Sequence, residues 1–356
     1  MPRAGSCFAR PVETGLAMGK GVAQVAVIGY GWWGRTICRT LADSTTVRVV
    51  RVVESAADAR AAAAAEAGEG IVVSERLEDA LADAQVDAVV LCTPHKAHAA
   101  QIVAAARAGK HVFCEKPLCL SLADARAAVA ACGAAGVTLG IGHERRFEPA
   151  VVDLRRRIAA GELGNILQIE ANFSQDKFFA LAPDNWRLSP EHAPVGPLSA
   201  TGIHLVDLAI AILGPAESVW ARLATRGSEF ANGDTLGLML GFGGGANALI
   251  SAMLATPFEG RFAVYGSRGW VEIRDRTHPE SPTGWDVTTV LRGGARSTVL
   301  VPPHASVRAN LEAFAGAILG VARYPVTPAE MLANVAALEA IMLSTRTGRV
   351  ELVAAS

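Results

Sequence analysis

Short apolar segments alternate with alanine-rich segments of helical length from Val22 to Ile141. The pattern predicts strands at 25–28, 47–53, 88–92 and 137–141, and one more that begins at His111 and runs into Glu115. It predicts helices near 33–42, 56–67, 75–84 and 95–108, and another that Ser121 opens with Asp124 three residues on. Strands and helices joined by such short connections indicate a doubly wound parallel sheet, which we assign to residues 23–142.

A glycine-rich motif, Gly29-Tyr-Gly31-Trp-Trp-Gly34, follows the first predicted strand and opens the first helix. In this context the three glycines serve a tight turn, close approach to a pyrophosphate, and helix–strand packing. Glu54 lies 20 residues past Gly34, at the end of the next strand. Its carboxylate would accept hydrogen bonds from ribose hydroxyls and repel a 2′-phosphate, so the motif favours NAD. Arg51 and Arg60 leave NADP open as the cofactor.

The segment Glu115-Lys116-Pro117 ends a predicted buried strand, and ligands bind at the carboxyl ends of strands in such sheets. Only five of the chain's 33 basic residues are Lys, and unlike Arg a Lys offers a pKa that can be tuned. Thr93-Pro94 turns the chain after another strand, while His98 is more typical of a packed histidine than of a base. The predicted cofactor-binding residues are Gly29, Gly31, Trp32, Trp33, Gly34, Glu54, Thr93, Pro94, His98, Glu115 and Lys116.

The regular alternation stops after Gly142, and residues 143–356 mix strands and helices in the manner of an α+β domain with a large, mostly antiparallel open sheet. The uncharged run from Thr235 to Ala255 is long enough for a membrane span. Its central glycines and two-residue periodicity favour a hairpin instead. Because both faces of this hairpin are apolar or small, we expect another subunit to cover the sheet in a homodimer or homotetramer.

The composition is that of a globular protein, with 51% apolar and 19% charged residues. The net charge of −1 gives no sign of a nucleic-acid or anionic-membrane partner. The six Cys lie in the first 132 residues without Cys-x-x-Cys spacing, which predicts free thiols, a reducing cytoplasmic location and no metal site. Residues 1–22 lack a signal peptide's apolar stretch and are expected to form a disordered tail, with Met18 an alternative start.

Five motifs together resemble one oxidoreductase family: Gly29–Gly34, Thr93-Pro94, Glu115-Lys116-Pro117, Arg145-Arg146-Phe147 and Gly202-Ile-His204-Leu-Val-Asp207. In this order they are similar to the glucose–fructose oxidoreductase / inositol dehydrogenase / rhizopine-catabolism (Gfo/Idh/MocA) family, over about residues 22–350. The resemblance implies a Rossmann domain followed by a substrate and oligomerisation domain. It also implies NAD- or NADP-dependent oxidation of sugar, inositol or polyol hydroxyls, or reduction of the matching ketones. Lys116 would then be catalytic, with a Lys116–Pro117 bond that can be cis.

The chemistry of such a reaction needs a base near neutral pKa for the hydroxyl proton. His204 is the natural candidate, because a helix N-terminus disfavours its charged form. Lys116 could polarise the same oxygen. The chain departs from the family at Ala200, where many members carry an Asp. Asp207 shares a helix face with His204 and could orient it. Arg145, Arg146 and Arg187 with Trp186 are further predicted substrate residues that could clamp a carboxylate, such as that of a sugar acid or a dihydrodiol acid.

The sequence therefore predicts an NAD(P)-dependent dehydrogenase that acts on a CH–OH group of a sugar, inositol, sugar acid or related cyclic diol. Two other functions stay open. One is a redox-neutral reaction, an elimination or glycoside cleavage through a transient ketone, in which bound NAD is not consumed. The other is a redox-silent nucleotide-binding regulator, which Ala200 would suit and the retained Lys116 and His204 would not.

Overall fold

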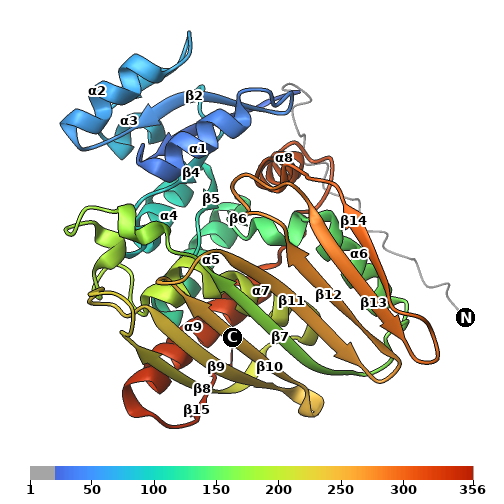
Figure 1. The fold of residues 1–356 in the computed structure, drawn as a ribbon. Helices are drawn as coiled ribbons and strands as arrows, with labels where there is room; N and C mark the ends of the chain where they lie inside the picture. Colours follow the sequence, from blue (N-terminus) through green and yellow to red (C-terminus); the bar gives the residue numbers. More distant parts are fainter. Residues whose placement is uncertain (1–20, 356) are drawn as a thin grey trace, which may run out of the picture.

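A computed structural model describes residues 21–355 of the protein, and its ribbon is shown in Figure 1. The predictions for the N-terminal tail and for a start at Met18 concern residues that lie almost wholly outside the described range. Within that range, the chain forms a parallel sheet followed by a larger mixed sheet, with helices between the two.

The first domain is the predicted doubly wound sheet, with six parallel strands in the order β3-β2-β1-β4-β5-β6. The strands are β1 (Ala23–Ile28), β2 (Val47–Val53), β3 (Val72–Ser74), β4 (Ala88–Leu91), β5 (His111–Cys114) and β6 (Leu139–Ile141). The helices are α1 (Trp32–Leu41), α2 (Ala57–Glu66), α3 (Leu77–Leu81), α4 (His98–Arg107) and α5 (Leu122–Ala135). Strand β3 was not among the predicted strands; it has only three residues, of which two are valines. The hydroxyl of Ser121 accepts the Asp124 N–H at 3.1 Å, which confirms the predicted start of α5.

The second domain contains a nine-stranded sheet in the order β14-β13-β12-β11-β7-β10-β9-β8-β15. Its strands are β7 (Ile166–Ser174), β8 (Ala216–Ala224), β9 (Thr235–Phe242), β10 (Asn247–Met253), β11 (Glu259–Gly266), β12 (Gly269–Asp275), β13 (Trp285–Leu291), β14 (Ser297–Val301) and β15 (Glu351–Leu352). Strands β7 and β10 pair in parallel and the other neighbours are antiparallel, so the mostly antiparallel sheet is confirmed.

The apolar run at 235–255 forms the antiparallel hairpin β9–β10, as its two-residue periodicity predicted. On β9, Leu236, Leu238 and Leu240 are buried, whereas Met239 between them is 44% exposed. Over residues 21–355, no helix has the length and apolar character that crossing a membrane requires.

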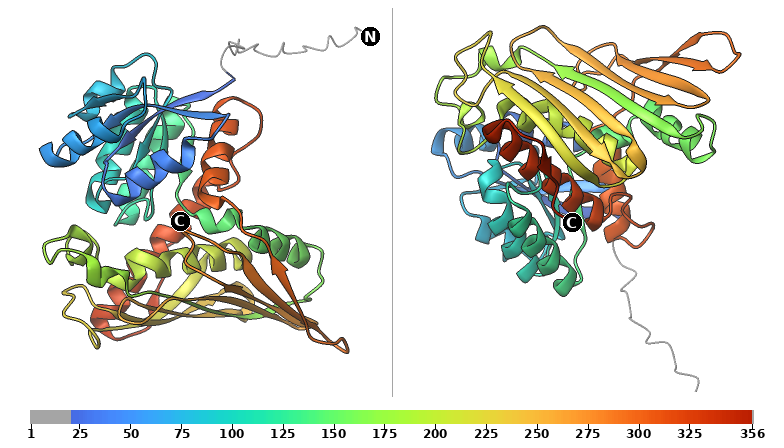
Figure 2. Two further views of the ribbon diagram at one scale, coloured as in Figure 1. Left: turned by 45° about the horizontal axis from the view of Figure 1, so that its top comes forward. Right: turned by 90° about the horizontal axis from the view of Figure 1, so that it is seen from below.

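Helices cover one face of the large sheet and leave the other bare (Figure 2). The covering helices include α7 (Ile203–Leu213) and α9 (Pro328–Thr347), whose apolar side chains share one core with β7–β13, while α6 (Pro149–Ala159) packs near β12. The alternation of buried and exposed side chains along β8, β9 and β10 follows from this one-sided cover.

Helix α8 (Ser306–Ile318) follows β14 in sequence but packs against the Rossmann domain. Its Leu311 and Phe314 are buried with Phe113 of β5, and the two phenyl rings meet edge to face at 5.5 Å. Met331 and Val335 of α9 likewise join the core on the other side of the parallel sheet. The C-terminal helices thus fix the two sheets relative to each other.

Candidate active site

The loop between β1 and α1 has the backbone that the glycine motif predicted. Gly29 has a positive φ of 91°, and a side chain at Gly34 would place its Cβ only 1.9 Å from the Gly29 carbonyl oxygen. A Cβ at Gly31, by contrast, would have no described atom within 4 Å. The loop is therefore tightly packed on its strand side and open at Gly31, which fits a dinucleotide pyrophosphate at the start of α1.

Glu54 follows β2 directly, beside this loop, and its carboxylate accepts hydrogen bonds from the backbone N–H groups of Tyr30 at 2.7 Å and Ala56 at 2.9 Å. The two arginines that left NADP open both have acidic partners. Arg51 donates to Asp83 at 2.7 Å, and Arg60 lies 3.1 Å from Glu75 while it also donates to the Glu54 carbonyl.

A cavity lies where the carboxyl ends of β4 and β5 meet the second domain. Its lining contains eight residues that the sequence predicted for the site: Trp32, Trp33, Thr93, Glu115, Lys116, Trp186, Arg187 and His204. Phe173, Phe178 and His95 add apolar and aromatic walls that the sequence reading did not identify. A concave, aromatic site with a few convergent polar groups is the usual form of a small-molecule site.

Lys116 follows β5, and its peptide bond with Pro117 is cis, as the resemblance implied. Its ammonium group donates to the carbonyl oxygens of Ala200 at 2.7 Å and Ser199 at 3.3 Å. Both carbonyls belong to the π-helical turn η5 (Leu198–Gly202), which precedes α7. Burial lowers the pKa of Lys116, and the nearby carboxylates of Glu144 and Glu115 partly offset that effect.

His98 does not line the cavity, although it was predicted to contact the cofactor. Its ring is fully buried, with Nδ1 2.8 Å from the Pro117 carbonyl oxygen and Nε2 3.0 Å from that of Thr93. The side chain thus lies between the turns that follow β4 and β5, as a packed histidine does, and its contact with the cofactor stays a prediction. Pro94 lies in the first of these turns and is also outside the lining.

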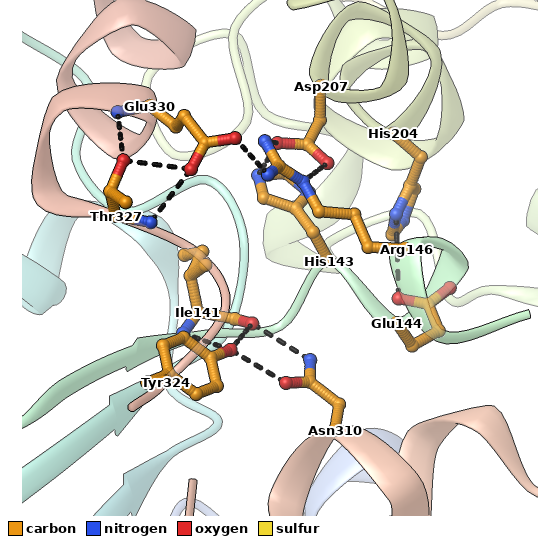
Figure 3. Close-up of polar contacts among 10 residues, drawn as sticks. All are labelled: Ile141, His143, Glu144, Arg146, His204, Asp207, Asn310, Tyr324, Thr327 and Glu330. Atoms are coloured by element: carbon orange, nitrogen blue, oxygen red, sulfur yellow. Dashed lines mark hydrogen bonds and ion pairs between the residues drawn. The ribbon is translucent and has the colours of Figure 1, made fainter. Parts of the chain in front are cut away.

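His204 lies in the first turn of α7 and is buried, with its Nδ1 3.5 Å from Glu144 Oε2 (Figure 3). Burial and the positive charge of Lys116 hold the pKa of His204 well below its usual range. The imidazole is therefore neutral near pH 7 and can accept a proton, as expected for a base.

Glu144 lines the cavity but is not among the residues that the sequence predicted for the site. It opens the 3₁₀ turn η2 (Glu144–Phe147) just after β6, lines the cavity, and has a side chain only 10% exposed. Burial raises its pKa to about 7. The signal was available, because β6 pairs in parallel with β5 and their carboxyl ends meet at one sheet edge.

Arg145 and Arg146 do not face the cavity, so the expectation that they clamp a substrate carboxylate is wrong. Arg145 is buried against Glu148 at 3.1 Å and Asp275 at 2.7 Å. Arg146 donates to both Asp207 oxygens, at 2.6 and 2.7 Å, and to Glu330 at 2.6 Å (Figure 3). Because it pairs with Arg146, Asp207 does not orient His204 but ties α7 to η2.

Arg187 does face the cavity, in the short turn η4 (Trp186–Leu188). Its guanidinium stacks on the Trp186 ring at 4.4 Å and lies over Trp32 at 5.6 Å. No described side chain forms an ion pair with it, and burial lowers its pKa to about 10. Among residues 21–355, no group of three or more His, Cys, Asp or Glu side chains is arranged to hold a metal ion.

Family comparisons agree with this fold and site. Residues 23–143 match the model of an oxidoreductase family with an NAD-binding Rossmann fold, and residues 151–272 match the GFO/IDH/MocA C-terminal domain. The chain belongs to the GFO/IDH/MocA family of NAD(P)-dependent oxidoreductases. The predicted fold class, enzyme class and cofactor class are thereby confirmed.

Individual relatives cover nearly the whole chain. The 1,5-anhydro-D-fructose reductase of Ensifer adhaerens is 31% identical over 86% of this chain and 91% of its own. A solved structure of a putative NADPH-dependent oxidoreductase from Desulfitobacterium hafniense superposes with a TM-score of 0.85 at 25% identity, covering 94% of this chain and 99% of that one. The aldose-aldose oxidoreductase of Caulobacter crescentus, complexed with glycerol, gives a TM-score of 0.81 at 27% identity, covering 93% and 99%.

Proposed function

We propose that the protein moves a hydride between a nicotinamide cofactor and the CH–OH or ketone carbon of a sugar or a related polyol. The observation that carries this proposal is the convergence of Lys116 and His204 in one aromatic-walled cavity, at the sheet edge that also holds the Gly29–Gly34 loop. The names of the relatives, a reductase of an anhydro-sugar and an aldose oxidoreductase, support a carbohydrate as substrate.

The cavity residues have different roles in this reaction. When bound, the cofactor supplies the acceptor or donor of the hydride. The neutral His204 takes the hydroxyl proton during oxidation and returns it during reduction. The Lys116 ammonium, held by the Ala200 and Ser199 carbonyls, is placed to stabilise negative charge on the reacting oxygen. Trp32, Phe173, Phe178 and Trp186 limit the access of water to these groups.

Within the class of nicotinamide cofactors, we propose a preference for NAD over NADP. The carboxylate of Glu54 lies where the adenosine ribose is expected, and it would repel a 2′-phosphate. Arg51 and Arg60 already pair with Asp83 and Glu75, so neither offers a free guanidinium for that phosphate.

The bare face of the large sheet supports the proposal of a homo-oligomer. Trp220, Met239 and Leu249 are cross-strand neighbours on β8, β9 and β10, and they are 38%, 44% and 40% exposed. An apolar patch of this kind on an open sheet is typical of a subunit interface. We expect sedimentation at micromolar concentration to show a dimer or tetramer and the Met239→Glu variant to dissociate. A wild-type monomer would contradict the proposal.

The test of function is the appearance of NADH or NADPH when the purified protein meets a panel of sugars, inositols, sugar acids and cyclic diols. Reduction of the matching ketones is followed in the reverse direction. We expect stoichiometric reduction of NAD with one class of carbohydrate and weaker use of NADP. Product formation without net change in the cofactor would instead favour the redox-neutral reaction. Tight NAD binding without any product would favour the regulator.

A further inference from the structure

Glu144 has a buried carboxyl group that the proposed mechanism does not yet use. Its carboxylate lies 3.5 Å from Nδ1 of the neutral His204, and no hydrogen bond links the side chain to another described residue. The positive charge of Lys116 also acts on it and partly offsets the effect of burial on its pKa. The neighbouring Glu148 is buried more deeply, but its carboxylate receives hydrogen bonds from the Arg145 guanidinium. Burying a carboxyl group without such partners is costly, which makes a purely structural role for Glu144 a poor explanation.

The surroundings of Glu144 hold it in this position. The Ile141 carbonyl, at the end of β6, accepts the Asn310 amide of α8 at 2.9 Å, and the Ile141 N–H donates to the Tyr324 hydroxyl at 3.2 Å (Figure 3). The Arg146–Asp207 pair then clamps η2 to the turn of α7 that carries His204. The two elements that bear Glu144 and His204 are therefore fixed on both sides.

We propose that Glu144 is the proton partner of His204, which accepts the Nδ1 proton when the substrate hydroxyl gives its own proton to Nε2. This inference rests on the proposed function. The proposal gives the site a carboxyl group from η2. Ala200 cannot supply one, because it has no side-chain oxygen and contributes only its backbone carbonyl, which accepts a hydrogen bond from Lys116.

The proton balance is simple in the oxidation direction. The substrate C–H bond breaks and its electron pair leaves with the hydride to the cofactor, while the hydroxyl proton moves to His204 Nε2. The Nδ1 proton passes to Glu144 Oε2, so the ring ends neutral and Glu144 ends as the acid. The buried Nδ1 has no hydrogen-bond partner among the described residues, and the carboxylate oxygen that it faces, at 3.5 Å, is Glu144 Oε2. Because Glu144 lines the cavity, it can release its proton to solvent afterwards.

The electrostatics favour this direction of transfer. The pKa of His204 lies well below its usual range, whereas that of Glu144 is raised to about 7, so a proton rests more stably on Glu144. The charged and titratable groups that act on Glu144 are Glu115 and Lys116 after β5, Arg145 and Glu148 from its own turn, and His204 and Asp207 of α7. Glu115, whose pKa is raised to about 8 by burial, interacts with Glu144, so the two titrate as a pair.

The test compares the pH dependence of kcat in the wild type and in Glu144→Gln. The wild-type rate of alcohol oxidation should rise with pH through about 7, because the carboxylate form accepts the proton. Ketone reduction should fall over the same range. Glu144→Gln should lose this step and about 10²-fold or more in kcat, with KM nearly unchanged. Glu144→Asp should recover the step, and Glu259→Gln, at an exposed ion pair on β11, should match the wild type.

A readout without turnover separates this inference from the proposed function. Infrared difference spectra should show carboxyl groups that titrate near neutral pH in the wild type, and one of these signals should be lost in Glu144→Gln while that of Glu115 remains. If Glu144→Gln does not fold, as judged by circular dichroism, Glu144→Asp is compared with the wild type instead and should shift that titration. A Glu144→Gln enzyme with wild-type kcat and pH profile would overturn the inference and leave the proposed function intact. A wild type inactive on every substrate would refute the function, and the infrared titration would then decide the inference alone.

Discussion

Glu144 and Arg146 lie two residues apart in the same short turn, and both are buried, yet the turn uses them in opposite ways. Arg146 is saturated by Asp207 and Glu330, and it faces away from the cavity. Glu144 faces the cavity beside the His204 ring, and no hydrogen bond links its side chain to another described residue. The Arg146 guanidinium has all of its partners within the protein. The Glu144 carboxyl group can still bind a ligand or exchange a proton.

The same contrast separates the other buried cations. Arg145 is enclosed by Glu148 and Asp275, whereas Lys116 bonds only to carbonyl oxygens and Arg187 only to aromatic faces. A fully paired charge fixes the frame, since removing one partner leaves the other buried and alone. A positive charge without an acidic partner is available to a substrate or cofactor. Side chains with strongly shifted pKa values are for this reason common at functional sites.

The largest expected effect is on turnover, from Lys116→Ala. Loss of the ammonium group removes the charge that stabilises the reacting oxygen, and kcat should fall by about 10²–10³-fold or more. The affinity for NAD, measured by fluorescence titration, should stay within a few-fold of the wild type. Lys96→Ala, which breaks only an exposed ion pair with Glu191, is the control and should keep full activity. Retained turnover in Lys116→Ala would refute the assignment of Lys116.

The next largest effect is on stability, from Arg146→Met. Asp207 would be left buried without its partner, and the free energy of unfolding, measured in urea, should fall by about 3–5 kcal/mol. Arg156→Met removes an arginine from an exposed pair with Asp153 and should cost about 0–1 kcal/mol. Equal losses in the two variants would show that the Arg146 pair does not hold η2 against α7.

The smallest effect is expected from Arg187→Met, which removes a part-buried guanidinium that has no acidic partner. Stability in urea should be unchanged or slightly higher. If the cofactor places an anionic group against Arg187, its KM should rise about tenfold or more. If the substrate does so, the KM of the substrate should rise by that factor. Comparing phosphate-free and carboxylate-free substrates would identify that group. A loss of stability as large as that of Arg146→Met would remove the distinction between the two kinds of buried charge.

Much of the fold follows from local sequence. Alternating apolar and alanine-rich segments predicted the parallel sheet, and the periodicity of 235–255 predicted the β9–β10 hairpin. Gly34 and the Ser121 cap act through atoms a few residues away, so the sequence alone was enough to place them. Lys116 and His204 could be selected because their residue types suit the chemistry and their motifs are distinctive.

Tertiary structure decided which buried charges are free. Nothing in the local sequence distinguishes Arg145 and Arg146 from Arg187. The fold brings Asp275 to Arg145, and it brings Asp207 and Glu330 to Arg146. The partner of Glu144 is likewise a residue of a distant helix, His204. Local patterns encode helices and strands through short-range backbone and packing preferences. An ion pair depends on where separate elements meet, and no local pattern records that.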